Sequence, residues 1–251
     1  MPRAGVKTAK IAMLDSGIDQ DHPDLSGKIA GQYDFVEDDA VANDPYGHGT
    51  QVAGIAAALT NNGRRVAGGC PRCKLLVARV LDANGVTTDS QVMAGIHWST
   101  KNGADVIKLS FGGSTPSYFF RAVVVAAAGN EENSSAEQYP AAYDAAIAVS
   151  ATDKYDRFAY FSSRGDWVDL AAPGTAILST RATRVGEAYD KYSGTSESAP
   201  FVSALAGLLA SEDKTAIGIR RRMQNTAKDL GAAGDDPKFG HGRIDANRAV
   251  P

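Results

Sequence analysis

Three glycine-flanked motifs carry residues that could share a proton. Asp15 lies in the motif LDSG, His48 in GHGT and Ser196 in SGTS. A serine hydroxyl becomes a nucleophile when a histidine base lies within hydrogen-bond reach, and the histidine needs an acceptor that fixes its tautomer. The three residue types therefore predict acyl transfer, with the serine as nucleophile, the histidine as proton carrier and the aspartate as its acceptor.

The elements expected around these residues would bring them together. Asp15 follows the apolar run 11–14, while His48 and Ser196 each stand at the start of a helical pattern. In an open α/β sheet, the carboxyl ends of strands and the starts of the following helices meet at one edge. Taken singly, the residues could be a turn aspartate, a structural histidine and a helix-capping serine. The linked motifs, in an order known for this catalytic geometry, favour catalysis.

Apolar runs and helical spacing alternate along the chain. This pattern predicts an α/β fold with a parallel sheet covered on both faces. The runs expected to form buried strands are 11–14, 75–81, 106–109, 123–127 and 147–149. Helical spacing covers 49–59, 90–100, 195–210 and 215–228.

Composition limits the classes of partner. The 251 residues are 43% hydrophobic and 22% charged, with a formal net charge of −3. That balance suits one domain and offers no basic surface to nucleic acid, and no apolar run approaches the roughly 20 residues of a membrane span. We therefore expect neither nucleic acid nor a membrane as a partner. Residues 1–10 have no apolar signal core, so a secreted protein would match this sequence after removal of its leader.

The cysteines form one short motif, CPRC, at Cys70 and Cys73. A pair at this spacing can be a local disulfide, a redox site or half of a zinc site, and no second Cys or His pair completes a zinc set. The pattern favours a structural disulfide, with free thiols as the main alternative.

Five motifs in one order resemble the subtilisin-like serine proteases, and among them the thermitase-type branch. They are DSGID, HPDL, GHGT, AAAGN and SGTSESAP, beginning at residues 15, 22, 47, 126 and 193. The resemblance implies a three-layer αβα fold with a central, mostly parallel sheet, in one catalytic domain over residues 1–251. It also implies a secreted, monomeric serine endopeptidase of broad specificity. Protein or peptide substrates are expected, with a pro-segment or a proteinaceous inhibitor as further candidate partners.

The resemblance assigns further roles at the site. Asn130 would donate its side-chain amide to the oxyanion, together with the backbone N–H of Ser196. An extended substrate peptide would pair with exposed backbone at the cleft. The residues implied to bind it are Ser110, Phe111, Gly112, Asn84, Gly85, Ala127 and Gly129.

Two loops resemble calcium sites of the thermitase branch, so Ca²⁺ is expected as a structural cofactor. The first would use Asp34, Glu37, Asp39, Asn43 and the carbonyl of Val41. The second would use Asp24, Asn62 and the carbonyls of Leu59, Arg64 and Val66. A solvated acidic loop remains the alternative for the first. The second lacks an acidic ligand from the N-terminal segment, and two arginines add positive charge beside it.

Three features depart from the family. Gln51 and Glu197 replace its usual residues, and Glu197, which stands where the family has Met, puts a carboxylate beside the nucleophile. Such a charge would favour the imidazolium form of His48, or the carboxylate would point away from it. The N-terminal arm is short, and only residues 111–121 connect two strands where the family has a helix. The alternative function is therefore a catalytically weak or inactive subtilisin-fold protein that binds peptides.

Overall fold

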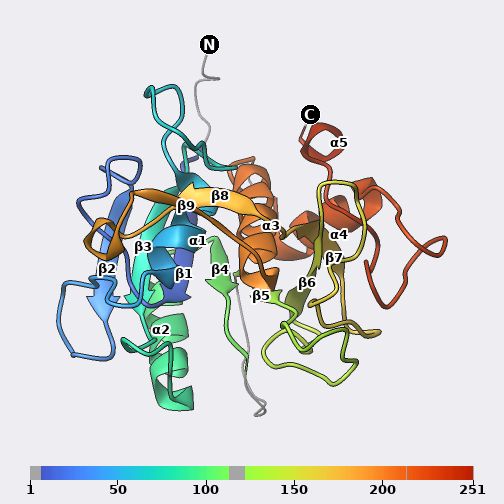
Figure 1. The fold of residues 1–251 in the computed structure, drawn as a ribbon, viewed down its shortest axis with the longest axis horizontal. Helices are drawn as coiled ribbons and strands as arrows, with labels where there is room; N and C mark the ends of the chain where they lie inside the picture. Colours follow the sequence, from blue (N-terminus) through green and yellow to red (C-terminus); the bar gives the residue numbers. More distant parts are fainter. Residues whose placement is uncertain (1–6, 113–121, 213, 251) are drawn as a thin grey trace.

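The computed structural model describes residues 7–112, 122–212 and 214–250 (Figure 1). Its strands are β1 (Lys10–Asp15), β2 (Ile29–Asp34), β3 (Lys74–Arg79), β4 (Val106–Leu109), β5 (Val123–Ala127), β6 (Ala146–Thr152), β7 (Leu170–Pro173), β8 (Ile177–Thr180) and β9 (Tyr189–Tyr192). Its helices are α1 (His48–Ala57), α2 (Asp89–Lys101), the 3₁₀ helix η1 (Thr183–Val185), α3 (Thr195–Ala210), α4 (Ala216–Thr226) and α5 (Ala246–Ala249).

A seven-stranded sheet with the order β2-β3-β1-β4-β5-β6-β7 forms the centre of the protein, and its strands run from left to right in this order in Figure 1. Every neighbouring pair in it is parallel. The five apolar runs expected as buried strands are β1, β3, β4, β5 and β6, so that prediction is confirmed. The prediction missed β2 and β7 and the antiparallel pair β8-β9. The strand β2 lies at the sheet edge and is only partly buried, so its sequence IAGQYD carries no apolar run.

Side chains alternate between the two faces of this sheet. One face packs against α1, α3 and α4, and the other packs against α2. In β1, Ile11 and Met13 belong to the first core, while Ala12 and Leu14 belong to the second. This alternation is the period of two that any strand imposes on its side chains. The three-layer αβα architecture with a mostly parallel sheet is therefore confirmed.

Two glycines allow the start of α1 to lie close to the end of β1. Gly47, the residue before the helix, has φ 93°, a left-handed conformation that favours glycine. A Cβ on Gly49 would lie 2.0 Å from the carbonyl oxygen of Gly17, in the loop that follows β1. The GHGT motif thus lets the helix begin in backbone contact with the strand that carries Asp15.

The longest helix, α3, crosses the first face of the sheet and begins at Thr195, as the sequence predicted. It packs against β4, β5, β6 and β7 and against α1. Thirteen of its sixteen residues are buried, including both small and polar ones. Its first turn is mostly buried against the sheet, while Ser196 within that turn is partly exposed.

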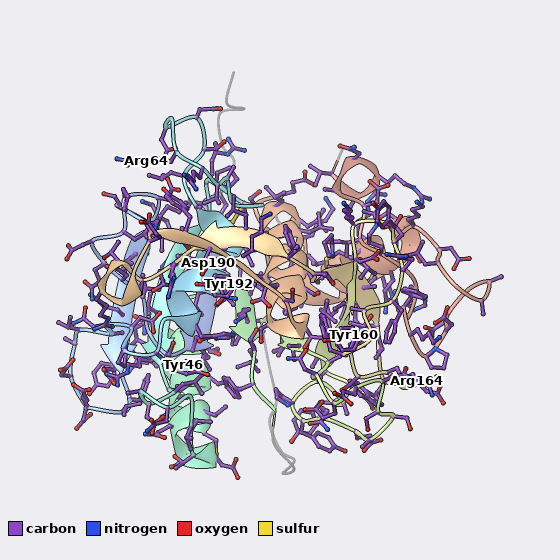
Figure 2. The ribbon with its side chains drawn as sticks, viewed as in Figure 1. Tyr46, Arg64, Tyr160, Arg164, Asp190 and Tyr192 are labelled. Atoms are coloured by element: carbon purple, nitrogen blue, oxygen red, sulfur yellow. A yellow bond between two sulfur atoms is a disulfide. The ribbon has the colours of Figure 1, made fainter. Side chains whose placement is uncertain are left out.

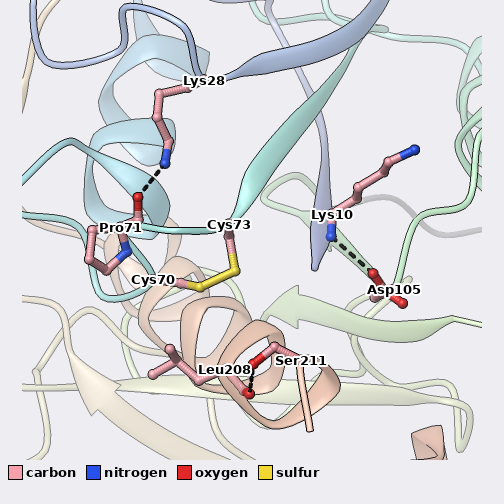
Figure 3. Close-up of a disulfide and its surroundings, with 8 residues drawn as sticks. All are labelled: Lys10, Lys28, Cys70, Pro71, Cys73, Asp105, Leu208 and Ser211. Carbon is pink, nitrogen blue, oxygen red and sulfur yellow. Dashed lines mark hydrogen bonds between the residues drawn. A yellow bond between two sulfur atoms is a disulfide. The ribbon is translucent and has the colours of Figure 1, made fainter. Parts of the chain in front are cut away.

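A disulfide joins Cys70 and Cys73, and this confirms the favoured sequence prediction (Figure 3). Both cysteines are buried in the core on the first face of the sheet. A Cβ on Gly207 of α3 would lie 2.8 Å from Cys73 Sγ, so the bridge packs directly on the helix.

The short connection over residues 111–121 falls mostly outside the described residues, because 113–121 are not among them. The expectation that it leaves part of the sheet without a helix stays a prediction. Among the helices of the described ranges, none combines the length and apolar character that a membrane crossing requires.

Candidate active site

A cavity of about 480 Å³ opens at the edge where β1 and β4 end and where α1 and α3 begin. Residues from both helices and from several loops line it. They are Tyr46, His48, Gln51, Leu81, Gly85, Ser110, Phe111, Gly112, Asn130, Tyr192, Ser193, Gly194, Ser196 and Glu197. Figure 2 labels Tyr46, which precedes α1, and Tyr192, which ends β9 close to Asp190.

A direct polar contact joins Asp15 and His48. His48 Nδ1 lies 2.7 Å from Asp15 Oδ1, and Asp15 is 1% exposed. An ionised carboxylate can only accept, so the proton of this bond sits on Nδ1 and the other ring nitrogen, Nε2, is free to act as a base. The histidine therefore has the tautomer that general-base chemistry requires.

Asp15 is ionised despite its burial. Its Oδ1 also accepts from the backbone N–H of Ser16 at 2.8 Å, and its Oδ2 accepts from Lys108 Nζ at 2.9 Å. Burial by itself would raise the pKa of Asp15, but the charges and hydrogen bonds of His48 and Lys108 outweigh it and hold that pKa well below its usual range.

Ser196 lies in the first turn of α3 and lines the same cavity as His48. Among the described residues, no hydrogen bond joins Ser196 Oγ to His48, and such bonds are often long before a substrate is bound. The structure thus brings the three motif residues to one edge of the sheet, with the aspartate and the histidine in direct contact.

Asn130 follows β5 and presents its amide to the cavity. Its Oδ1 accepts from the backbone N–H of Thr195 at 2.9 Å and from Thr195 Oγ1 at 3.0 Å. The hydroxyl of Thr195 in turn accepts from the N–H of Gly129 at 3.1 Å. Because both groups of Thr195 donate, the accepting atom must be the oxygen, and Nδ2 is left as a donor. A Cβ on Gly194 would lie 3.4 Å from that nitrogen, which places it beside the start of α3.

The predicted substrate-binding residues separate into two sets. The cavity is lined by Ser110, Phe111, Gly112 and Gly85. Asn84, Ala127 and Gly129 are not among its lining residues; Ala127 is buried in β5 and packs in the core of the first face. The structure therefore does not place these three positions in the wall of the cavity.

Glu197 is a second buried carboxylate of the site. It is 2% exposed, and its Oε1 accepts from Gln51 Nε2 of α1. Burial raises the pKa of Glu197 to about 7, although His48, Lys108 and the bond from Gln51 act in the opposite direction. The sequence flagged both Gln51 and Glu197 as unusual, and the structure shows that they contact each other.

Sequence reasoning missed Lys108, whose ammonium contacts Asp15. The residue interrupts the apolar run VIKL of β4 and is 0% exposed. A lysine inside a run that reads as a fully buried strand was the available signal, because lysine is almost never fully buried unless it is paired. The tyrosines of the cavity, Tyr46 and Tyr192, carried no comparable sequence signal.

The first loop predicted to bind calcium contains an ion pair. Arg79 Nη1 lies 2.6 Å from Asp34 Oδ2 and 2.8 Å from Glu37 Oε1. Asp39 Oδ1 accepts the N–H of Val41 at 2.7 Å. A calcium ion would have to share two of its carboxylates with this guanidinium, so the donor set fits the arginine better than it fits Ca²⁺.

In the second loop, hydrogen bonds already occupy the carboxylate of Asp24. Its oxygens accept from Asn62 Nδ2 at 2.6 Å and from the hydroxyl of Tyr189 at 2.8 Å. Burial and this bond raise the pKa of Tyr189 to about 12. Within residues 7–112, 122–212 and 214–250, no group of three or more His, Cys, Asp or Glu side chains is arranged to hold a metal ion.

Comparison with known proteins gives a consistent result. Residues 6–242 match the model of the subtilase family, described as Peptidase_S8. The chain is 44% identical to thermitase of Thermoactinomyces vulgaris, over 96% of this chain and 88% of that protein. It is 43% identical to a thermophilic serine proteinase of Bacillus sp. (strain AK1), over 98% of this chain and 62% of that protein. Identity to subtilisin DY of Bacillus licheniformis is 38%, over 96% and 90% of the two chains.

Proposed function

The chain belongs to the subtilase family and is a serine endopeptidase that hydrolyses peptide bonds in proteins or peptides, and we propose that Asp15, His48 and Ser196 carry its chemistry. The resemblance to the thermitase-type branch is confirmed by the similarity to thermitase. The observation that carries the proposal is the 2.7 Å bond between His48 Nδ1 and Asp15. That bond leaves Nε2 as the basic nitrogen, on a residue that shares one cavity with Ser196.

In the first half of the reaction, Ser196 Oγ attacks the carbonyl carbon of the scissile bond while its proton passes to His48 Nε2. The C–N bond then breaks as His48 returns this proton to the leaving amine, and the acyl group stays on Ser196 as an ester. Asp15 stabilises the imidazolium that exists between the two transfers. In the second half, water gives its proton to His48, attacks the ester and releases the acid, and Ser196 regains its proton.

Asn130 is proposed to stabilise the oxyanion of both tetrahedral intermediates. Its Nδ2 is the donor left over after Oδ1 has accepted two bonds from Thr195. The backbone N–H of Ser196 is the second proposed donor, since the first N–H groups of a helix have no partner within the helix. Removal of the corresponding asparagine in subtilisin lowers kcat by about 10²–10³, and we expect a similar loss for Asn130→Ala.

The test uses a chromogenic peptide anilide or casein with the parent protein and with Ser196→Ala. We expect a loss of about 10⁶-fold in kcat, the size known for the nucleophile of subtilisin. A fluorophosphonate should label the parent at Ser196 and leave the variant unlabelled. Equal hydrolysis by the two proteins would remove Ser196 from the mechanism. Absence of both hydrolysis and labelling in a folded parent would favour the peptide-binding alternative.

Several wider features are part of the same proposal. We expect residues 1–251 to form one catalytic domain, secreted and monomeric, with a pro-segment or a proteinaceous inhibitor able to bind at the cavity. Broad specificity is consistent with the small residues Gly85, Ser110 and Gly112 in the cavity wall.

Calcium also remains a prediction for the two loops. If Ca²⁺ binds, the protein should melt at a higher temperature in its presence than in the presence of a chelator. Differential scanning calorimetry measures both temperatures. Equal melting temperatures would leave Arg79 as the cation that stabilises the first loop.

A further inference from the structure

The ammonium of Lys108 lies beneath the active site with no access to water. Lys108 is 0% exposed, and its position in β4 pairs with Met13 of β1, two residues before Asp15. Its side chain therefore points to the face of the sheet that α3 covers, where it meets Asp15. Burying an ammonium ion is unfavourable by several kcal/mol unless an anion is close. Since an amine is far more basic than a carboxylate, the proton of the pair belongs on Lys108.

Glu197 lies near the same lysine but belongs to α3, the helix that covers this face of the sheet. It lies in the first turn of α3, where its Oε1 is bonded by Gln51 and its Oε2 lies beside Gly194. A Cβ on Gly194 would lie 2.9 Å from that oxygen, so the glycine makes room for the carboxylate. Glu197 interacts electrostatically with Lys108 and with His48.

Charged and titratable groups from three elements face Glu197. They are His48 of α1, Lys108 of β4 and Tyr192 of β9, with the neutral amide of Gln51 as its hydrogen-bond donor. Tyr192 is neutral near pH 7, since the ordinary pKa of tyrosine is 10.0 and burial raises it further. The charge that Glu197 meets is therefore the charge of the lysine and of the imidazole.

The charges of the site explain why both residues are present. Lys108 contacts one oxygen of Asp15 and His48 contacts the other. The lysine therefore cancels much of the negative charge with which the aspartate would stabilise an imidazolium. Above its pKa of about 7, Glu197 is ionised and supplies a second negative charge near the same imidazole. With both residues in place and Glu197 ionised, the group formed by Asp15, Lys108, Glu197 and His48 becomes neutral when the imidazole accepts the proton of the serine.

We propose that Lys108 and Glu197 are positioning residues that act on His48 as an opposed pair, the lysine weakening and the glutamate strengthening the preference of the imidazole for a proton. Neither residue transfers a proton itself. The inference rests on the proposed function of His48 as the base. It explains why an unusual cation and an unusual anion occur together at this site.

The pair is tested by the pH dependence of kcat/KM, because the acid limb of that profile reports the protonation of the base in the free enzyme. Lys108→Met should move the acid limb to higher pH by about one unit, because it removes a positive charge near the imidazole. Glu197→Gln should move it to lower pH, by up to about one unit, because it removes the negative charge that Glu197 carries when it is ionised. The double variant should return the limb to within a few tenths of a unit of the parent.

Lys28→Met is the matched control. Lys28 is also buried, but its Nζ bonds the carbonyl of Pro71 beside the disulfide, as Figure 3 shows, and it is not among the residues that line the cavity. Its replacement should leave the acid limb in place. If both site variants moved the limb in the same direction, or neither moved it, the pair would have a merely structural role.

A second readout does not need turnover. The imidazole of His48 can be titrated by NMR in Ser196→Ala, alone and combined with Lys108→Met or Glu197→Gln. The midpoints should shift in the same opposite directions. Opposite shifts without hydrolysis by the parent would contradict the proposed protease mechanism and support the pair, whereas hydrolysis without opposite shifts would contradict the pair alone.

Discussion

Two carboxylates occupy the active-site edge, one at the end of β1 and one at the start of α3. Asp15 and Glu197 are both almost fully buried, and both lie near Lys108 and His48. Their acidities are nevertheless displaced in opposite directions. The pKa of Asp15 is held well below its usual range, while that of Glu197 rises to about 7.

The difference comes from direct donors rather than from burial. Asp15 accepts from His48, from Lys108 and from the N–H of Ser16, so each of its oxygens has a strong partner. Glu197 accepts a hydrogen bond from the neutral amide of Gln51, whereas Lys108 and His48 act on it through space. A buried carboxylate stays ionised when donors, above all charged ones, contact it directly. Proximity to positive charge without contact does not offset the loss of water.

The opposite shifts also make opposite contributions to stability. The lowered pKa of Asp15 stabilises the fold above the unfolded value near 3.8, and that contribution is lost as the pH falls through the folded pKa. The raised pKa of Glu197 favours the fold below its unfolded value of 4.5, and that contribution is lost as the pH rises through about 7.

Among the tests of this comparison, the largest effect is expected from replacing Asp15, the carboxylate with more hydrogen-bond donors. Asp15→Asn should lower kcat by about 10⁴-fold at pH 8, because an amide can donate to Nδ1 and stabilise the wrong tautomer of His48. Initial rates on a peptide anilide measure this loss. Asp169→Asn is the control, since Asp169 is ion-paired with Arg220 away from the cavity, and its rate should stay within a few-fold of the parent. A small loss in Asp15→Asn would mean that Glu197 can replace Asp15 as the partner of His48.

Removal of the shared cation should be next in size. Lys108→Met leaves Asp15 buried without its ammonium partner, and we expect a loss of about 3–5 kcal/mol in the free energy of unfolding at pH 8. Urea denaturation of a Ser196→Ala background avoids self-digestion. Lys28→Met, which loses a bond to a neutral carbonyl, should lose less. Equal losses in the two variants would show that burial of the aliphatic part of the lysine side chain, and not the ion pair, determines the loss of stability.

Glu197→Gln should remove a pH dependence that the parent shows. A shift from 4.5 to about 7 corresponds to about 3 kcal/mol. The variant should therefore gain that amount relative to the parent between pH 4.5 and pH 8, since the ionised carboxylate is the less stable form in the fold. Unfolding free energies across this range test it. A constant difference between the two proteins would contradict the raised pKa.

The smallest effect tests the side-chain donor that contacts Glu197, the amide of Gln51. Gln51→Met removes the amide that bonds Oε1, which should raise the pKa of Glu197 further, by about one unit or ~1.4 kcal/mol. The stability difference between Gln51→Met and the double variant Gln51→Met, Glu197→Gln should keep growing to a pH about one unit higher than the difference between the parent and Glu197→Gln does. If the two differences stopped growing at the same pH, the amide would not stabilise the ionised form.

Much of the fold could be predicted from local pattern. Apolar runs such as Val123–Ala127 correctly predicted buried parallel strands. The helix α3 begins and ends at the residues that the helical spacing predicted. The edge strand β2 and the hairpin β8-β9 escaped prediction, because their side chains are largely exposed or only half-buried. The residues that form the Asp15–His48 contact were predicted because their motifs are short and glycine-flanked.

The role of Lys108 could not be predicted in the same way, although its position in an apolar run was visible. Nothing local indicates that residues 93 positions apart form a contact, and the sequence does not state which face of β4 the lysine uses. Similarly, Gln51 and Glu197 were noted as unusual without a sign that they bond each other across 146 positions.

The sequence by itself determined which side chains the protein could use for chemistry, where five strands of the sheet lie and which protease family it belongs to, because periodicity and glycine-flanked motifs are local. Only the tertiary structure decided the charge state of those side chains. Ionisation depends on the number and the charge of the donors that reach a buried carboxylate, and those donors arrive from α1, β4 and α3, which meet only when the sheet and its helices have assembled.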